Sequence, residues 1–477
     1  MAVAAGEKHT VVVCEDGSVF SFGNNQYYGQ LGTGDYFNAL VPTRVGGLPP
    51  SSDPVRQVAA GRYHTGIVTE AGDLLMCGWG EHGQLGLGNK DNRATPTLVA
   101  RAVFDGEAVL MVACGSEHTV AVTEGGGVYT FGCMYDGKLG YGDWAAPWEE
   151  NQLVPRRVPP AAFNGERVVM VAAGGMHTVG LSEAGHVFTW GGNMFGQLGH
   201  NDREHQWAPR QVDPEWFGGE KVVFVAAGGY HTVVVTAGGR LYTWGHGRKG
   251  QLGHGDTENR LVPTLVEGLG APEGGQVVMA ACGDVHTLVV TQDGGLWACG
   301  FGGWGQLGLN DYENRRVFER LEGTTGAAFG GARVVAAAAG DKHSAAVTED
   351  GALWTWGWDY YGQLGHDDDL GKLGHNGEYF KVVPTRVPAA SLEGTRIGRC
   401  RPLPTDHAVA LAMGTHSRLG AASPVRVLGG EVSLLTMITR FSGAWVGGVA
   451  GRSEGLVRLL GGVTANPAHR YQMETVG

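Results

Sequence analysis

The sequence predicts an all-β protein: a seven-bladed β-propeller with about four short antiparallel strands in each blade. A unit of 54 to 59 residues recurs seven times along the chain, a length that suits one four-stranded blade. Within each unit apolar and polar residues alternate, as in VAAGGYHTVVVTAGGRLYTWG at residues 225–245, and such alternation is typical of strands. Glycine is abundant, with 83 residues, and recurs at the same places in each unit, so it indicates turns and not disorder.

Each unit is marked by a histidine with fixed glycines around it. One glycine lies three residues before the histidine, another lies fourteen residues after it, and a Gly-Gln/Lys-Leu-Gly turn follows. The seven histidines are His9, His64, His118, His177, His231, His286 and His343. Because every unit carries this histidine at the start of the same strand, we expect it to make structural hydrogen bonds between blades. A metal site would instead need ligands gathered at one place.

The chain divides into a propeller, expected at residues 1–412, and a short Gly-rich C-terminal tail of low helical character, expected at 413–477. The repeats lie near residues 1–57, 58–110, 111–169, 170–223, 224–278, 279–335 and 336–395, followed by a degenerate closing segment at 396–412. In the first unit, strands are expected at residues 2–5, 9–13, 18–22 and 42–45. Closing the blades into a ring removes long unpaired strand edges, which would otherwise promote aggregation.

Composition and charge argue against several classes of protein. The formal net charge is −12 and the pI about 5.8, so direct binding to the phosphates of nucleic acid is not expected. No stretch of about 20 apolar residues occurs, so no membrane span is expected. The chain starts inside the first repeat with no signal peptide or basic leader, and its seven cysteines include no Cys-x-x-Cys pair. We therefore expect an intracellular protein, cytoplasmic or nuclear.

The combined pattern VAAGxxHTxxVTExGxxxxWGxxxxGQLGxG resembles the repeat of the family named for the regulator of chromosome condensation, over roughly residues 1 to 395. The resemblance implies a seven-bladed propeller that acts by binding proteins. Guanine-nucleotide exchange on a small GTPase is the best-known activity of that family. Other members of similar sequence serve as photoreceptors, cilium proteins or modules of ubiquitin ligases, so the fold does not decide the function.

The sequence contains no constellation for bond-making catalysis, and we assign no catalytic residue. Gly-x-Gly-x-x-Gly occurs at 78–83, 245–250 and 300–305, but it runs into the Gly-Gln-Leu-Gly turn and not into a helix that could bind a pyrophosphate. There is no Walker-type Gly-Lys-Ser/Thr, no Gly-x-Ser-x-Gly elbow and no His-Glu-x-x-His motif. We expect no cofactor and no metal. The only activity that we expect, at most, is guanine-nucleotide exchange on a partner protein.

The up-and-down strand order places the Gly-x-x-His turn and the loop before Gly-Gln-Leu-Gly at one end of every blade. This end is variable and rich in aromatic residues, as a protein-recognition surface on a rigid scaffold requires. The residues predicted to form the binding face are Tyr28, Arg62, Tyr63, Phe195, Tyr230, Lys249, Trp304, Trp358, Asp359 and Tyr361. For any single one of them, covering a loop or plugging the channel is at least as good an interpretation. For the face as a whole, we favour binding.

The sequence therefore favours a protein-binding propeller scaffold whose partner is another protein, and the resemblance extends this to exchange on a small GTPase. The alternative is an adaptor or targeting module without exchange activity, for example in ubiquitin ligation. Ultraviolet reception ranks last, because similar photoreceptors use stacked tryptophans with arginines and no Gly-Trp-Arg-His turn occurs here. We expect the propeller to be monomeric.

Overall fold

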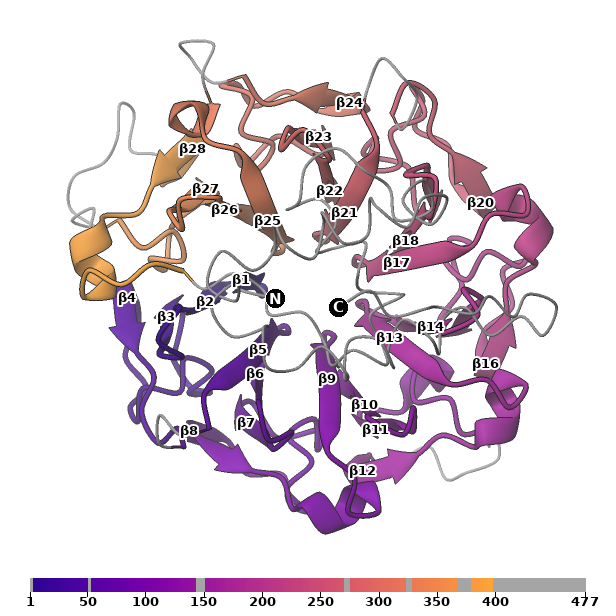
Figure 1. Ribbon diagram of the computed structural model, residues 1–477, viewed down its shortest axis with the longest axis horizontal. Coiled ribbons are helices and arrows are strands. Elements are labelled where there is room, and N and C mark those ends of the chain that lie inside the picture. The colour runs from indigo at the N-terminus through magenta and orange to yellow at the C-terminus, as the bar shows by residue number, and fades with distance from the viewer. Residues whose placement is uncertain are drawn as a thin grey trace, which may run out of the picture. The chain divides into compact units, whose positions relative to one another are not determined.

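The computed structural model describes residues 3–49, 53–142, 151–269, 275–322, 328–366 and 379–397. In these residues, seven four-stranded antiparallel sheets form the blades of a propeller around a central axis (Figure 1). Within each sheet, neighbouring strands are consecutive in the sequence and run from an inner strand at the axis to an outer strand at the rim. The predicted seven-bladed propeller is confirmed. The expected tail, 413–477, and most of the expected closing segment lie outside the described residues.

The strands of blades one to four have five or six residues each, except β1, which has three. Their bounds are β1 Val3–Ala5, β2 His9–Val13, β3 Val19–Gly23, β4 Ala39–Arg44; β5 Val55–Ala60, β6 His64–Thr69, β7 Leu74–Gly78, β8 Arg93–Leu98; β9 Val109–Cys114, β10 His118–Thr123, β11 Val128–Gly132, β12 Gln152–Arg157; and β13 Val168–Ala173, β14 His177–Ser182, β15 Val187–Gly191, β16 Gln206–Gln211.

Blades five to seven repeat the same arrangement. Their strands are β17 Val222–Ala227, β18 His231–Thr236, β19 Leu241–Gly245, β20 Arg260–Leu265; β21 Val277–Cys282, β22 His286–Thr291, β23 Leu296–Gly300, β24 Arg315–Arg320; and β25 Val334–Ala339, β26 His343–Thr348, β27 Leu353–Trp358, β28 Phe380–Arg386. In blade one the predicted fourth strand started three residues too late. A register shift between Ser21 and Gly23 lets Ala39 pair with Gly23, which lengthens β4 toward its N-terminus.

Short 3₁₀ helices in the linkers between blades were not predicted. They are η1 Arg101–Phe104, η3 Pro160–Phe163, η4 Pro214–Phe217, η5 Ala328–Gly331 and η6 Ala389–Leu392, while η2 Tyr135–Gly137 lies in a blade-three loop. In the linkers a buried phenylalanine or leucine is followed by a left-handed residue and a glycine, as in Phe104-Asp105-Gly106, where Asp105 has φ of 57°. A short side chain such as aspartate tolerates this conformation, which turns the chain into the next inner strand.

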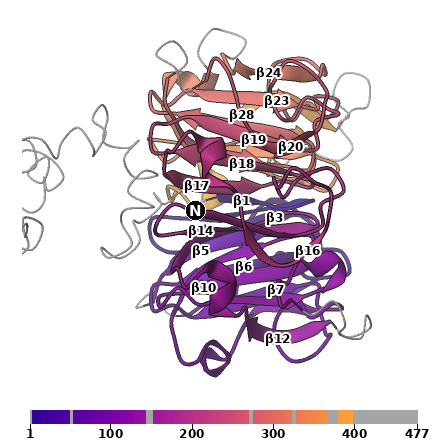
Figure 2. The same ribbon diagram turned by 90° about the vertical axis from the view of Figure 1, so that its right-hand side faces the viewer.

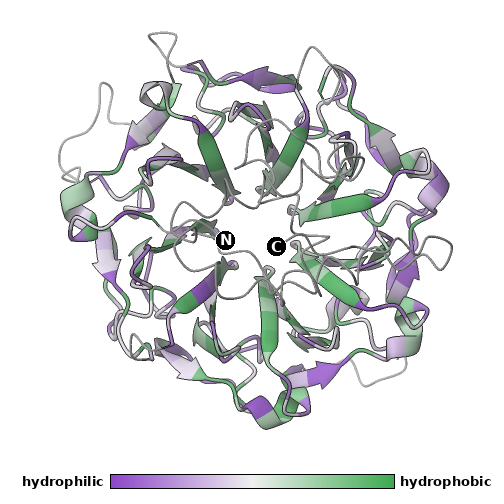
Figure 3. Ribbon diagram, in the orientation of Figure 1, coloured by the Kyte–Doolittle hydropathy of each residue, from purple (hydrophilic) through white to green (hydrophobic). Residues whose placement is uncertain are grey.

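The hydrophobic core lies between neighbouring blades. The inner strands carry mostly apolar residues, whereas the outer strands are more polar, which gives the green centre and purple rim of Figure 3. One core slot on the third strand faces the Thr or Ser after each repeat histidine, and it is filled by Phe22, Cys77, Phe131, Trp190, Trp244, Cys299 and Trp356. All seven side chains are buried, so Cys77 and Cys299 are packing residues like the aromatic residues at the same position of other blades.

The repeat histidines form a closed ring of hydrogen bonds between blades. Each Nε2 lies 2.9–3.0 Å from the hydroxyl of the threonine or serine that follows the next histidine in the ring, ending with His343 and Thr10. Each of these hydroxyls donates its own hydrogen to a main-chain oxygen, as Thr119 does to Gln84 at 2.7 Å. The histidine must therefore donate its Nε2 hydrogen to this hydroxyl. The buried Nδ1 of each repeat histidine has no hydrogen-bond partner, which favours the neutral ring with its hydrogen on Nε2.

The seam of the ring lies between blade seven and blade one, which exchange no strand among the described residues. Beside the bond from His343 to Thr10, the amide of Glu15 donates to the carbonyl of Arg396 at 2.9 Å, and Ile397 forms an antiparallel bridge with Cys14. Ile397 is fully buried, in a cluster that includes residues of both blades. Residues 396 and 397, the start of the expected closing segment, therefore join blade seven to blade one.

We expect the substitution Ile397→Asp to destabilise the ring by about 3–5 kcal/mol, because it buries an unpaired carboxylate between the two blades. Chemical denaturation followed by circular dichroism measures this loss in the free energy of unfolding. The matched control is Glu393→Ala in the same segment, whose exposed ion pair with Arg44 contributes little. Equal denaturation midpoints for Ile397→Asp and wild type would show that the bridge to Cys14 does not hold the seam.

Candidate protein-binding face

The connections between strands gather at the two ends of the propeller. Seen from the side, the strands run broadly along the axis of the ring (Figure 2). The turns from first to second strand and the loops from third to fourth strand thus lie at one end, which we call the loop end. The hairpins between second and third strands and the linkers between blades lie at the opposite end, the hairpin end.

The loop end exposes most of the large hydrophobic side chains that reach solvent. Among the described residues, seven of the eleven exposed large hydrophobic side chains belong to loops between third and fourth strands: Tyr27, Tyr36, Phe37, Tyr135, Met194, Tyr312 and Tyr360. Trp216, in η4 at the hairpin end, is an exception. Exposed aromatic residues concentrated on the loops of one end are typical of an interaction surface.

The first aromatic cluster joins blades six and seven. Trp304 and Trp358 lie 6.1 Å apart, and Trp358 stacks on Tyr360 at 5.9 Å. The ammonium of Lys342 lies over both indoles, 5.1 Å from the ring centre of Trp304 and 4.8 Å from that of Trp358. Tyr361 meets Trp358 edge-on at 5.5 Å. The structure thus brings together three of the predicted face residues and adds Lys342 to them.

The second cluster joins blades one and two. Tyr28 lies 5.0 Å from Tyr63 and 5.5 Å from Trp79, a residue that the sequence analysis did not select. Trp79 follows a repeat glycine at the position that Trp358 holds in blade seven, and this alignment was a signal for it. Lys8 links the two clusters, with its ammonium 5.4 Å from the Tyr63 ring and 5.3 Å from that of Tyr361.

The other predicted residues lie apart from these clusters or have structural contacts. Phe195 and Tyr230 pack against each other at 5.3 Å on blades four and five. Lys249 is exposed, with its ammonium 5.2 Å from the ring of Phe301. The Asp359 carboxylate accepts a hydrogen bond from the amide of Leu364 at 2.8 Å and so holds its own loop. The loop end therefore divides into an aromatic arc on blades six, seven, one and two, and a smaller group on blades four and five.

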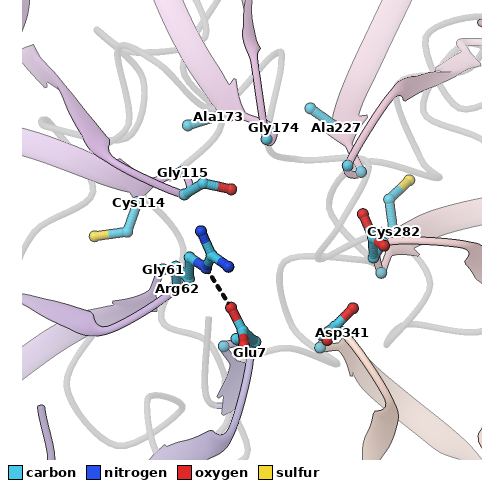
Figure 4. Close-up of a pocket in the computed structure, with 18 of the residues that line it drawn as sticks. Glu7, Gly61, Arg62, Cys114, Gly115, Ala173, Gly174, Ala227, Cys282 and Asp341 are labelled. Atoms are coloured by element: carbon cyan, nitrogen blue, oxygen red, sulfur yellow. Dashed lines mark hydrogen bonds and ion pairs between the residues drawn. The ribbon is translucent and has the colours of Figure 1, made fainter. Parts of the chain in front are cut away.

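The channel opens at the loop end in a cavity of about 550 Å³, lined by the first turns of all seven blades (Figure 4). Arg62 pairs with Glu7 at 2.5 Å across this mouth, and Lys8 lies 3.2 Å from the same carboxylate. Burial raises the pKa of Glu7, but Arg62 and Lys8 outweigh it and hold the pKa below its usual range. Burial, followed by the nearby Asp284 carboxyl, raises the pKa of Asp341 to about 6. The carboxylate of Glu7 is thus neutralised by nearby cations, whereas Asp341 lies beside a second carboxyl group.

The described residues contain no group of three or more His, Cys, Asp or Glu side chains placed to hold a metal ion. In that part of the chain there is also no helix with the length and hydropathy needed to cross a membrane. The candidate functional site consists of the aromatic arc and the mouth of the channel.

Three family models match the chain. One describes the RCC1-like domain, over residues 149–422, and two describe the regulator of chromosome condensation (RCC1) repeat, over residues 16–68 and 71–122 and over residues 55–84 and 112–138. The ultraviolet-B receptor UVR8 of Arabidopsis thaliana is 35% identical over 368 residues, which are 76% of this chain and 78% of the receptor. The chain belongs to the RCC1 repeat family.

Other RCC1-family proteins differ in what surrounds the propeller. The E3 ubiquitin-protein ligase HERC2 of Homo sapiens is 32% identical over 385 residues, which are 80% of this chain but 7% of the ligase. The crystal structure of Prp20p from Saccharomyces cerevisiae, studied for its binding to Gsp1p and histones, matches with a TM-score of 0.65 at 25% identity. That match covers 81% of this chain and 87% of Prp20p. Membership of the RCC1 family therefore fixes the architecture and leaves the partner open.

Proposed function

We propose that this RCC1-family propeller is a protein-binding module that engages its partner through the aromatic arc of the loop end. The observation that carries the proposal is the concentration of exposed aromatic side chains in the loops of this end. Tryptophan and tyrosine contribute most to protein–protein binding when they are held in place by neighbours. Trp358 meets this condition, because Trp304, Tyr360 and Lys342 pack around it.

Nucleotide exchange on a small GTPase is the finer activity that we propose for this face. Its support is the likeness to Prp20p, a structure described together with binding to Gsp1p. An exchange factor needs a rigid surface that holds the nucleotide-free GTPase, and a closed ring of blades provides such a surface. An adaptor module without exchange activity is the alternative, and similarity to the propeller region of HERC2 supports it.

Ultraviolet reception is the weakest candidate despite the likeness to UVR8. Similar photoreceptors carry tryptophan and arginine in the Gly-Trp-Arg-His turn, whereas this chain has other residues directly before the repeat histidines. These are Lys8, Tyr63, Glu117, Met176, Tyr230, Val285 and Lys342. Size-exclusion chromatography before and after ultraviolet-B irradiation tests this candidate, and an unchanged elution volume is expected.

The double substitution Trp358→Ala and Tyr361→Ala is expected to weaken capture of the protein partner at least tenfold, because it removes the centre of the aromatic arc. The full chain serves as bait in a lysate containing EDTA, which removes the magnesium that helps a GTPase hold its nucleotide. The affinity for the captured protein is then measured with the purified pair. Release of a small GTPase by GTP and magnesium would support exchange, whereas capture of other proteins would support the adaptor.

The matched control is Trp216→Ala, which removes an exposed tryptophan at the hairpin end and is expected to leave capture unchanged. Thermal unfolding of each variant shows whether the propeller stays folded. A partner that binds the Trp358→Ala, Tyr361→Ala variant as tightly as wild type, but loses affinity for Trp216→Ala, would place the interaction at the hairpin end and overturn the proposal.

A further inference from the structure

The mouth of the channel differs in charge and in bulk from blade to blade. The residues after the repeat glycines are, in blade order, Glu7, Arg62, Ser116, Gly175, Gly229, Asp284 and Asp341. Blades six, seven and one thus present carboxylates, while blades four and five present no side chain at this position. A Cβ at Gly229 would collide with Oδ1 of Asp284, so the glycine leaves room for that carboxylate. The mouth of the cavity is therefore least crowded at blades four and five, which lie next to the carboxylates of blades six, seven and one.

The carboxylates of the mouth are not equally balanced by cations. Glu7 pairs with Arg62 and Lys8, and Glu117 lies 3.9 Å from Arg62 and 3.7 Å from the buried ammonium of Lys138. Asp341 has only a distant ion pair with Lys342, at 3.8 Å. Asp284 forms no ion pair with a cation of the described residues; its carboxyl lies beside that of Asp341. The carboxyl pair on blades six and seven therefore has one ammonium nearby, that of Lys342, for two carboxyl groups.

This carboxyl pair lies next to the first aromatic cluster. Lys342 connects the two, because its ammonium approaches Asp341 and also lies over the indoles of Trp304 and Trp358. The aromatic rings at this place therefore already accept a cation over their faces. A group that is planar, positively charged and able to donate two parallel hydrogen bonds suits both the carboxyl pair and the indole faces. Among protein side chains, only the arginine guanidinium has all three properties.

We propose that the mouth of the channel binds an arginine side chain of the protein partner, paired with Asp284 and Asp341 and bordered by Trp304 and Trp358. The proposal rests on the proposed protein-binding function and names the chemistry of the partner at one point of the face. A lysine ammonium fits less well, because it is a strongly hydrated point charge without a planar face. The cavity of about 550 Å³ has room for one long side chain and its flanking backbone.

The test uses the full chain and the peptide acetyl-Gly-Gly-Arg-Gly-Gly-amide as probe, followed by tryptophan fluorescence and calorimetry. The same peptide with citrulline, which keeps the shape and removes the charge, is the first comparison, and the lysine peptide is the second. We expect the arginine peptide to bind at least tenfold more tightly than the citrulline peptide. We expect the lysine peptide to fall between them. Equal binding of the arginine and citrulline peptides would overturn the proposal.

The double substitution Asp284→Asn and Asp341→Asn is expected to abolish the preference for arginine while keeping the size and packing of both side chains. Asp293→Asn, at an exposed carboxylate of the hairpin end that pairs with Arg320, is the matched control and should keep the preference. An unchanged preference in the double variant would show that these carboxyls do not bind the guanidinium.

The two proposals can fail separately. If the partner is captured through Trp358 and Tyr361 but binds the Asp284→Asn, Asp341→Asn variant with wild-type affinity, the arginine site is wrong and the protein-binding face stands. If capture is insensitive to both double variants, the partner does not bind at the loop end, and the proposed function is wrong as well.

Discussion

Lowering the pH from 7.5 to 5.5 is expected to unfold the propeller cooperatively, because the folded ring holds its repeat histidines neutral. Burial lowers the pKa of His9, His177, His231, His286 and His343 to about 3 and that of His64 to about 4. Burial and the charge of Lys138 hold the pKa of His118 well below its usual value. The unfolded chain instead titrates near pH 6.5.

The direction of the effect follows from these two states. Each folded-state pKa lies below the unfolded-state value, so the stabilisation is complete above about pH 6.5 and is lost as the pH falls toward the folded-state pKa. At pH 5.5 each histidine has lost about 1.4 kcal/mol. For the seven together the loss is on the order of 10 kcal/mol, which is comparable to the whole stability of a typical domain.

The measurement is chemical denaturation at a series of pH values between 7.5 and 5.5, followed by fluorescence and circular dichroism. The variant His177→Gln should be less stable than wild type at pH 7.5. Because it has one repeat histidine fewer to protonate, its free energy of unfolding should fall less steeply with decreasing pH, by the uptake of about one proton. A denaturation midpoint that does not change over this pH range would show that the histidines are not neutral and buried as the structure has them.

The substitution Gly174→Ala is expected to cost about 3 kcal/mol or more, because the repeat glycine has no room for a methyl group. A Cβ at this position would collide with the carbonyl oxygen of Gly228 in the next blade and lie 2.6 Å from the ring of His177. The added methyl group would therefore push apart two blades and displace one histidine of the ring. The expected result is a large fall in the thermal unfolding temperature.

The control is Gly46→Ala, at an exposed glycine whose added Cβ would meet no atom within 4 Å. Because neither glycine has a left-handed backbone, the comparison isolates the contact from the effect of backbone conformation. We expect the unfolding temperature of Gly46→Ala to equal or slightly exceed that of wild type. Similar temperatures for both variants would mean that the blades can separate enough to accept a methyl group.

The sequence was sufficient to predict the fold because the same local solution is repeated seven times. In every blade the repeat histidine and the Thr or Ser after it mark the start of the same strand. A pattern that would be weak evidence in one blade therefore becomes strong evidence when it occurs seven times. The linker helices were missed because each depends on one buried side chain, such as Phe104 or Leu392, whose burial is decided by the adjoining blades. Such contacts between blades cannot be predicted from the alternation of apolar and polar residues that identifies the strands.

The candidate face could be predicted in outline, since strand order fixes which connections share an end. The contacts within it could not be predicted in the same way. Trp304 and Trp358 belong to neighbouring blades, and the packing of blade six against blade seven brings them together around Lys342. The uneven charge at the mouth likewise depends on contacts between neighbouring blades, such as that of Glu7 with Arg62 and that of Asp284 with Asp341.

The strand register at the seam shows that the ring of blades does not depend on where the chain begins and ends within it. Ile397 faces Cys14 and Val3 faces Val12, as Val222 faces Thr236 and Val225 faces Val234 in blade five. Ile397 and Val3 thus hold positions three apart along one inner strand, with room for two residues between them, although they are distant in sequence. A circular permutant that joins them through two residues and is cut in another linker would rebuild the same ring. The covalent chain alone therefore decides between which two blades the ends of the chain lie, and the packing between blades does not depend on that position.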